Sequence, residues 1–488
     1  MKKILSTCIL VASTLLATIL LASCQPKNRI IEKPFYLTRN TPSIEVSRIS
    51  LTDTITVLDM IVSGMPDTWI GIAPTSTLTD NQKNVYTILS GKGIKLGEGF
   101  VIPESGKGTF QLLFPPLNPD AQWIDFSEGP EVKDGFMIEG IQLKDMQPLE
   151  SLLPKDVLTP MTDKNRSMEE QPFVFGETTI KGKVLDYNEG MHQYVNITSF
   201  NPLIGNSGYV FIELKPDGSF EHKLNVLGTS IVWVHYAGSA TTAEIFAAPK
   251  QTSEVYFNIR EAARKKSDIH ADTAPLGKEF YYKGPLSTVV YELSEAKKLL
   301  REEYKVYDFK KTPEELLDEY KQVQFGYIKQ WSEAIHDADL SKATKEYILA
   351  GLPVSLSLRL VEASSKLAEN YRLNMDVYDG DKAYAMFEKL RKAQTPDYIA
   401  YDLSASHNNP QSFFTPDFGL LVKSLAMNKQ IETQGLLNEM ITAARLYAVI
   451  CDFVPLKEEQ KEKKKGRNLK RNFRRICNSS GFRFNYWN

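Results

Sequence analysis

Cysteine is scarce in this sequence, and its spacing excludes several kinds of site. The 488 residues include four cysteines, Cys8, Cys24, Cys451 and Cys477. No two of them form the C-x-x-C spacing that dithiol redox sites and cysteine zinc sites use. The sequence therefore predicts neither a paired-cysteine redox centre nor a cysteine-based metal site.

Complete catalytic motifs are also lacking. None of the six histidines lies in H-E-x-x-H, there is no G-x-S-x-G, and the glycines of "LSGKGIKLGEG" fit no phosphate-binding loop. Ser294 and Lys297 match S-x-x-K without its companion motifs, so we attribute that match to chance. His222 and His235 fall in expected strands of one domain, where separate positions are the favoured interpretation. We assign no catalytic, cofactor-binding or metal-binding residue, and whether the chain is an enzyme stays undecided.

Long hydrophobic runs are absent after the N-terminus. Lys2 and Lys3 precede the apolar stretch of residues 4–21, and "LASC" then ends at Cys24. This order is typical of a lipoprotein signal peptide, which is cut before a cysteine that receives lipid. The alternative is an ordinary transmembrane anchor, but the small residues before Cys24 and the polar "QPKNR" after it favour the lipoprotein. We expect a signal peptide over residues 1–23 and lipidation at Cys24.

The segment after the expected cleavage site indicates a tether and a compartment. Residues 24–44 have no strong pattern, which is typical of a tether between a membrane anchor and a folded body. "QPKNRI" lacks the acidic run that sends some lipoproteins to the cell surface. We therefore expect a bacterial envelope lipoprotein that contacts the membrane through lipid on Cys24, in the outer membrane facing the periplasm.

Acidic residues are absent from the last 26 positions, which carry nine Lys and Arg residues. The remaining chain holds 49 basic and 60 acidic residues, a net charge of −11, which argues against a nucleic-acid partner. The abrupt change after a lysine run favours a frameshifted or truncated ending, so residues 463–488 are expected to be a basic, disordered or frameshifted tail. A basic-aromatic arm for anionic surfaces and a solvated tail are the alternatives.

Strand and helix patterns divide the body. Residues 45–146 and 173–260 contain short β-branched and aromatic runs separated by turn residues, the pattern of antiparallel sandwiches. Residues 147–172 carry several prolines and no sustained period, which indicates a linker. Residues 286–455 have a helical period. The predicted fold class is multidomain, all-β followed by all-α: two antiparallel β-sandwich-like domains and then a helical domain.

Two local signals within these regions are specific. In "TFQLLF", Phe110, Leu112 and Phe114 alternate with more polar positions, so they should share the buried face of a strand. Before "PEELLDEY", Thr312 can cap a helix and Glu315 can complete a capping box. The first signal predicts a half-buried strand, and the second predicts a helix that begins directly after Thr312.

Several phrases together resemble a known family: "SRISLTDTITVLDM", "GKGIKLGEGFVIPESGKGTFQLLFPPLN", "IDFSEG", "FMIEGIQL" and "ITSFNPLIGNSGYVFIELKPDGSF". They are similar to the N-terminal regions of TlpA-like thiol–disulfide oxidoreductase lipoproteins of the bacterial envelope, and the resemblance covers most of residues 45–455. It implies one or two β domains and a helical region before a thioredoxin-like domain. Nothing here matches the W-C-x-x-C of that domain, so no redox residue is carried over and the redox domain is missing.

Two functions follow as hypotheses. The first is a membrane-anchored lipoprotein that keeps the N-terminal scaffold of a TlpA-like oxidoreductase without its redox domain. The second is a non-catalytic envelope lipoprotein that binds a glycan or a protein. Glycan binding needs exposed aromatic side chains on a sheet face, and the sequence offers three tryptophans in strand-like text, Trp69, Trp123 and Trp233. Core packing is the commoner role of such residues.

Overall fold

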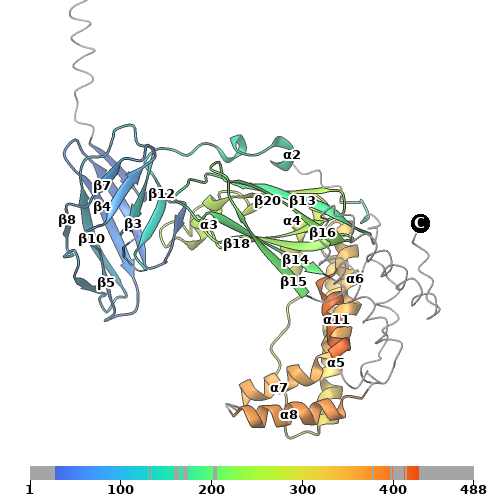
Figure 1. Cartoon of the computed structure of the whole chain (residues 1–488). Helices are drawn as coiled ribbons and strands as arrows, with labels where there is room; N and C mark the ends of the chain where they lie inside the picture. Colours follow the sequence, from blue (N-terminus) through green and yellow to red (C-terminus); the bar gives the residue numbers. More distant parts are fainter. Residues whose placement is uncertain are drawn as a thin grey trace, which may run out of the picture.

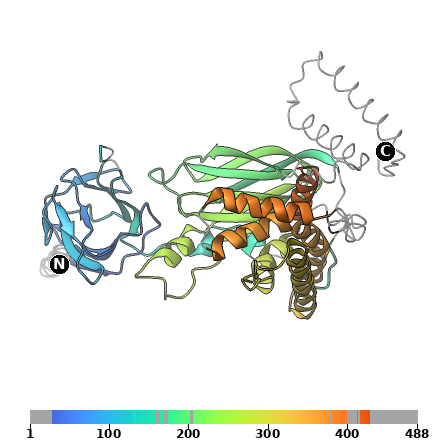
Figure 2. The ribbon, with the colours of Figure 1, turned by 90° about the horizontal axis from the view of Figure 1, so that it is seen from below.

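The computed structural model describes residues 28–427, apart from residues 130, 133, 159–163, 169–173, 202–205, 376–378, 396–397, 399–411 and 413–414. The expected signal peptide, the expected lipidation site Cys24 and the expected tail at 463–488 lie outside the described residues. Two β-rich bodies follow one another and a group of helices lies beyond the second, as Figures 1 and 2 show from two directions.

The first β-rich body is a sandwich of two five-stranded sheets. Their orders are β1-β3-β4-β10-β8 and β2-β12-β11-β6-β7, while β5 and β9 form a separate antiparallel pair. The strands are β1 (Arg29–Glu32), β2 (Thr38–Arg39), β3 (Ile44–Leu51), β4 (Thr56–Ser63), β5 (Trp69–Gly71), β6 (Thr77–Asp80), β7 (Val85–Thr87), β8 (Ser90–Lys92), β9 (Gly99–Val101), β10 (Lys107–Phe114), β11 (Trp123–Ser127) and β12 (Met137–Gln142).

Alternation along the strands explains this sandwich. On β10, Phe110, Leu112 and Phe114 are buried, as the sequence predicts. They lie opposite Met60, Leu58 and Thr56 of β4 across an antiparallel register. Because successive strand residues point to opposite faces, each buried row forms one layer of the core and the rows between them meet the solvent.

The second β-rich body has two four-stranded sheets, β16-β13-β19-β20 and β15-β14-β17-β18. The strands are β13 (Phe175–Val184), β14 (Tyr194–Asn201), β15 (Asn206–Glu213), β16 (Ser219–Leu227), β17 (Ser230–Tyr236), β18 (Thr241–Ala247), β19 (Thr252–Phe257) and β20 (Phe280–Lys283). The turn between β15 and β16 carries the chain from one sheet to the other. These two consecutive strands therefore form neighbouring edges of the two sheets.

The helices begin between the two β bodies and dominate after residue 286. They are η1 (Leu149–Ser151), α2 (Lys155–Leu158), α3 (Ile259–Lys266), α4 (Ser287–Leu299), α5 (Pro313–Asp337), α6 (Lys342–Val361), α7 (Ala363–Asn374), α8 (Gly380–Ala393) and α11 (Pro416–Met427). Thr312 caps α5 and forms the predicted capping box with Glu315: the Thr312 hydroxyl accepts from the Glu315 amide, and the Glu315 carboxylate accepts from the Thr312 amide.

The predicted fold class, all-β followed by all-α, is wrong. β13 and β19 pair in parallel, so one sheet of the second body is mixed. Helix α3 interrupts the β region, because β20 follows it and pairs with β19. Strand patterns reveal neither the partner of a strand nor its direction, and "FYYK" at β20 is too short to read as a strand beside helical text.

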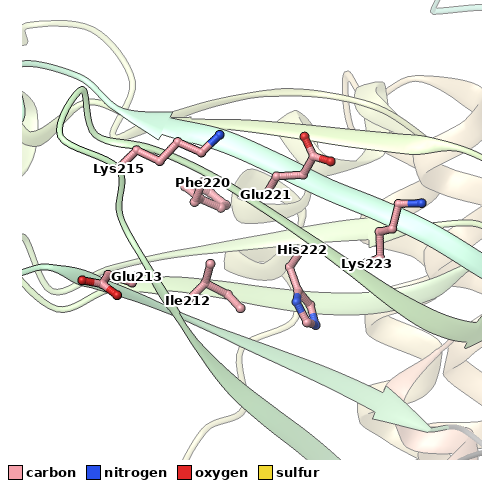
Figure 3. Close-up of a pocket in the computed structure, with 7 residues that line it drawn as sticks. All are labelled: Ile212, Glu213, Lys215, Phe220, Glu221, His222 and Lys223. Carbon is pink, nitrogen blue, oxygen red and sulfur yellow. The ribbon is translucent and has the colours of Figure 1, made fainter. Parts of the chain in front are cut away.

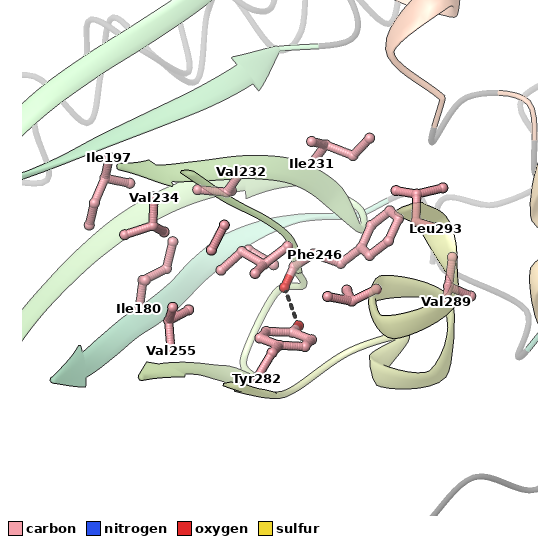
Figure 4. Close-up of a cluster of buried hydrophobic side chains, with 14 of the residues drawn as sticks. Ile180, Ile197, Ile231, Val232, Val234, Phe246, Val255, Tyr282, Val289 and Leu293 are labelled. Atoms are coloured by element: carbon pink, nitrogen blue, oxygen red, sulfur yellow. Dashed lines mark hydrogen bonds between the residues drawn. The ribbon is translucent and has the colours of Figure 1, made fainter. Parts of the chain in front are cut away.

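The helices share two buried clusters, and the first is their own, with members on α5, α6, α7, α8 and α11. The other cluster joins both sheets of the second body to helices α4, α5 and α6 (Figure 4). Phe246 of β18 packs edge-to-face on Tyr347 of α6, with 5.3 Å between ring centroids, and Val289 and Leu293 of α4 lie in the same cluster. Helices α4, α5 and α6 thus bury apolar residues against the sheets as well as against other helices, which a helical period alone does not reveal.

None of the described helices is by itself long and apolar enough to cross a membrane, while the bent pair α6 and α7, with 65° between them, meets the length and composition test jointly.

Candidate functional site: an aromatic sheet face

The outward face of sheet β15-β14-β17-β18 carries an ordered set of aromatic and polar side chains, which we call the aromatic face. Val195, Ile197, Val232 and Val234 of this sheet point into the core, so the residues alternating with them point outward. The strand register sets eight of these in two rows across the sheet: Phe211, Asn196, His235 and Thr242, and then Tyr209, Thr198, Trp233 and Glu244.

The aromatic residues of β15 are the most exposed part of this face. Tyr209 is 71% exposed and Phe211 is 62% exposed, and their rings meet edge-to-face with 5.8 Å between centroids. Tyr194 of β14 is also exposed and lies opposite Glu213 of β15. Large side chains rarely stay this exposed in a cluster unless a ligand or partner covers them. The aromatic face is therefore the strongest candidate binding surface in the described chain.

Uncharged polar groups fill the middle of the face. The Thr198 hydroxyl donates to Asn196 Oδ1 at 3.3 Å, and His235 Nδ1 lies 2.9 Å from the Thr242 hydroxyl. These contacts fix the two side chains through Asn196 Oδ1 and His235 Nδ1. Among the described residues, no hydrogen bond reaches the Asn196 amide nitrogen or His235 Nε2, so both atoms are available to a ligand. Trp233 is half-buried and packs edge-to-face against Phe200.

The opposite sheet of the same body has a different surface. Its outward side chains form ion pairs: Lys181 with Glu254 at 3.3 Å, and Lys223 with Glu177 at 2.9 Å. Such neutralised, solvated pairs are an ordinary surface. The opposite sheet also has an exposed aromatic, Phe175 of β13, but it is only 38% exposed, against 71% for Tyr209 and 62% for Phe211.

A slot of about 530 Å³ opens beside the aromatic face, where β15 and β16 diverge (Figure 3). Ile212 and Phe220 line its floor, and His222 points into it; burial lowers the pKa of this histidine. Charged residues of both signs surround the mouth: Glu213, Lys215, Glu221 and Lys223. The slot thus adjoins the aromatic face at Glu213, which belongs to both.

Two carboxylates, the buried Glu139 and the half-buried Asp125, lie where the two β bodies meet. Glu139 of β12 is 8% exposed and accepts a 2.5 Å hydrogen bond from the Thr38 hydroxyl, and Asp125 of β11 accepts one from the Gly140 amide. Burial raises the pKa of Asp125 to about 6, and burial together with the charge of Asp125 raises the pKa of Glu139 to about 7. A Cβ on Gly190 of the second body would lie 3.2 Å from Asp125 Oδ2, so that body closes over them.

These carboxylates are not accompanied by catalytic partners. A nucleophile with its base, or a second carboxylate across an open cleft, would be needed for group transfer or glycoside hydrolysis. Among the described residues, no group of three or more His, Cys, Asp or Glu side chains could hold a metal ion. We interpret Asp125 and Glu139 as a titratable joint between the two β bodies.

The three candidate tryptophans do not come together. Trp69 is exposed on β5 and Trp123 is half-buried on β11, both in the first sandwich, whereas Trp233 lies on the aromatic face of the second body. His222 and His235 lie on different sheets, one in the slot and one on the aromatic face. The sequence therefore identified one residue of the face, Trp233.

The Ser294 and Lys297 pair has no catalytic geometry. Both lie on α4, but Lys297 Nζ makes a 2.6 Å ion pair with Glu244 of β18. The ion pair engages the Lys297 ammonium with a residue of another element, and not with Ser294. The position of Lys297 has another consequence, because its ammonium neutralises Glu244, the acidic residue in the second row of the aromatic face.

The sequence patterns did not identify three residues of the face as candidates: Tyr194, Tyr209 and Phe211. The text "YVFIEL" is apolar at every position from Tyr209 to Ile212, so the alternation that marks an outward face is not visible. The composition carries a signal: Tyr and Phe alternate with Val and Ile. Aromatic side chains are found at partly solvent-exposed positions more often than aliphatic ones, so this alternation indicates that the aromatic residues face outward.

Comparisons with known proteins add little. No family model matches the chain, and no curated protein sequence matches it significantly. Among solved structures, a pullulanase from Anoxybacillus sp. LM18-11 complexed with maltotriose is 12% identical with a TM-score of 0.19, covering 39% of this chain and 24% of that one. A pullulanase from Bacillus acidopullulyticus is 9% identical with a TM-score of 0.15, covering 43% and 35%. The matches span about a quarter to a third of those enzymes, and TM-scores this low support no inference about fold or ligand.

Proposed function

We propose that this chain is a lipid-tethered protein of the bacterial envelope that binds a glycan on the aromatic face and catalyses no reaction itself. The tether is lipid on Cys24, which holds the body at the outer membrane on its periplasmic side. The body is a scaffold that resembles the N-terminal region of the TlpA-like oxidoreductases. None of the four cysteines falls among the described residues.

The observation that carries the proposal is the exposure of Tyr209 and Phe211 beside uncharged polar groups. Aromatic rings offer an apolar surface to the C–H faces of sugar rings, and they lose little conformational entropy on binding. The amide of Asn196, the hydroxyl of Thr198 and the imidazole of His235 can donate to or accept from sugar hydroxyls. A shallow sheet face with this mixture suits a hydroxyl-rich chain.

The charges of the face support binding without hydrolysis. Canonical glycoside hydrolysis uses two carboxyl groups on opposite sides of the scissile bond. Glu244 is engaged by Lys297, and Glu213 lies at the strand end beyond the polar rows. Both belong to one flat face, so they cannot flank a bound sugar from two sides.

A protein partner is the second candidate, and the free edge of β15 favours it. β15 pairs with β14 on one side and is the terminal strand of its sheet. An extended peptide can add to such an edge through main-chain hydrogen bonds. This alternative predicts binding that depends on β15 and is independent of sugars.

The proposal is tested with the full chain carrying Cys24→Ala, which removes the lipid site. A panel of neutral and charged oligosaccharides is titrated by calorimetry against this protein and against Tyr209→Ala and Phe211→Ala. Each variant should weaken binding at least about tenfold, or about 1.4 kcal/mol. Tyr384→Ala is the control, because Tyr384 on α8 is equally exposed at 62% and also contacts a neighbouring Phe. Equal loss in the control, or no binding by the parent, would reject the proposal.

A further inference from the structure

We infer that the aromatic face selects neutral glycans, in segments of about three sugar rings, and discriminates against polyanionic ones. This inference rests on the proposed function and specifies its ligand class. It comes from two features of the face: the distribution of charge along the two rows, and their width across four strands.

The two rows contain no unpaired cation. Of their eight residues, the charged one is Glu244, and Lys297 neutralises it at 2.6 Å. Glu213 at the end of β15 is exposed and has no ion pair among the described residues. Its carboxylate therefore adds net negative charge beside Tyr194, opposite which it lies. A carboxylated or sulfated glycan would meet this charge without a compensating cation.

Two lysines, Lys215 and Lys223, line the slot beside the aromatic face. Lys215 lies beside the slot, and in Figure 3 its side chain and that of Glu213 extend in different directions. Lys223, further along the slot, is already paired with Glu177 at 2.9 Å. Lys215 and Lys223 therefore line the slot, and the lysine that reaches the aromatic face, Lys297, is already paired with Glu244.

The width of the face limits the length of the segment. Neighbouring strands lie about 4.8 Å apart, so four strands place the outer members of a row about 14 Å apart, room for about three sugar rings. Helix α4 borders the far side, where its Lys297 reaches Glu244 of β18. The most exposed aromatics, Tyr209 and Phe211, lie at the other side, on the open edge strand.

The test compares neutral hexose oligosaccharides of two to six rings with uronic acid oligosaccharides of the same lengths, using the full chain with Cys24→Ala at low and high salt. Affinity for the neutral series should rise up to about three rings and then level off, with little salt dependence. The uronic acid series should bind at least about tenfold more weakly at low salt, and the difference should shrink at high salt as screening grows.

Glu213→Gln separates the charge effect from shape. This variant should strengthen binding of the uronic acid series several-fold at low salt and leave the neutral series unchanged. Glu369→Gln, which removes an exposed acid on α7, should change neither series. Uronic acid binding as tight as neutral binding would overturn the inference while the proposed function stands, and its loss in Lys215→Gln would place that ligand in the slot. Binding of neither series would overturn the proposed function and this inference with it.

Discussion

Replacing Glu139 with glutamine should remove much of the pH dependence of stability. Burial first, and then the charge of Asp125, raise the pKa of Glu139 from its usual 4.5 to about 7 in the folded protein. The folded state thus keeps a proton that the unfolded chain releases. The contribution of Glu139 to stability is therefore fully present below about pH 4.5 and is lost as the pH rises through about 7. A shift of this size corresponds to about 3 kcal/mol.

The glutamine side chain is neutral at every pH and keeps an oxygen that can accept from the Thr38 hydroxyl. Glu139→Gln should therefore match the wild type near pH 4.5 and exceed its free energy of unfolding by as much as about 3 kcal/mol at pH 8. Asp125, with its pKa raised to about 6, contributes a similar dependence in both proteins. Urea unfolding followed by far-ultraviolet circular dichroism at pH 4.5, 6 and 8 measures the difference.

Glu128→Gln is the matched control. Glu128 is as buried as Glu139, but its two carboxylate oxygens accept the backbone amides of Ala73 and Phe136, each at 2.7 Å. An amide has only one oxygen to accept these two bonds, so this variant should lose about 1–3 kcal/mol, whereas Glu139→Gln should gain stability at pH 8. Equal pH dependence of the wild type and Glu139→Gln would refute the assignment of a buried, titrating carboxyl at the joint.

Two further predictions concern the tether and the helices. In cells fed a palmitate analogue, the wild-type protein should carry the label and the Cys24→Ala protein should not, because the lipid needs that thiol. Equal labelling of the two purified proteins would reject the lipoprotein. Thr312→Ala should lower the free energy of unfolding by about 1 kcal/mol, since it removes the hydroxyl that accepts from the Glu315 amide. Thermal unfolding measures this loss. An unchanged midpoint would mean that the capping box does not contribute to stability.

Local signals in the sequence were sufficient to predict an element when the whole signal lies within that element. The alternation of Phe110, Leu112 and Phe114 placed these residues in the core, and Thr312 with Glu315 placed the start of α5. Both signals are decided within a few residues of chain. They do not depend on what packs against the element, so tertiary context could not overturn them.

Long-range relations could not be predicted in this way. The parallel pairing of β13 with β19 joins segments about 70 residues apart, and nothing local encodes it. The outward exposure of Tyr209 and Phe211 depends on which face of β15 meets the core. The burial of Glu139 likewise results from the second β body closing over the first, which its own strand does not reveal.

The central claim is that a glycan lies on the aromatic face, and a crystal structure of the protein soaked with a neutral hexose trisaccharide tests it most directly. The account predicts sugar density over the rings of Tyr209 and Phe211, with hydroxyls within hydrogen-bond distance of Asn196 and His235. Density confined to another surface, such as the exposed Trp69 of β5, would contradict it.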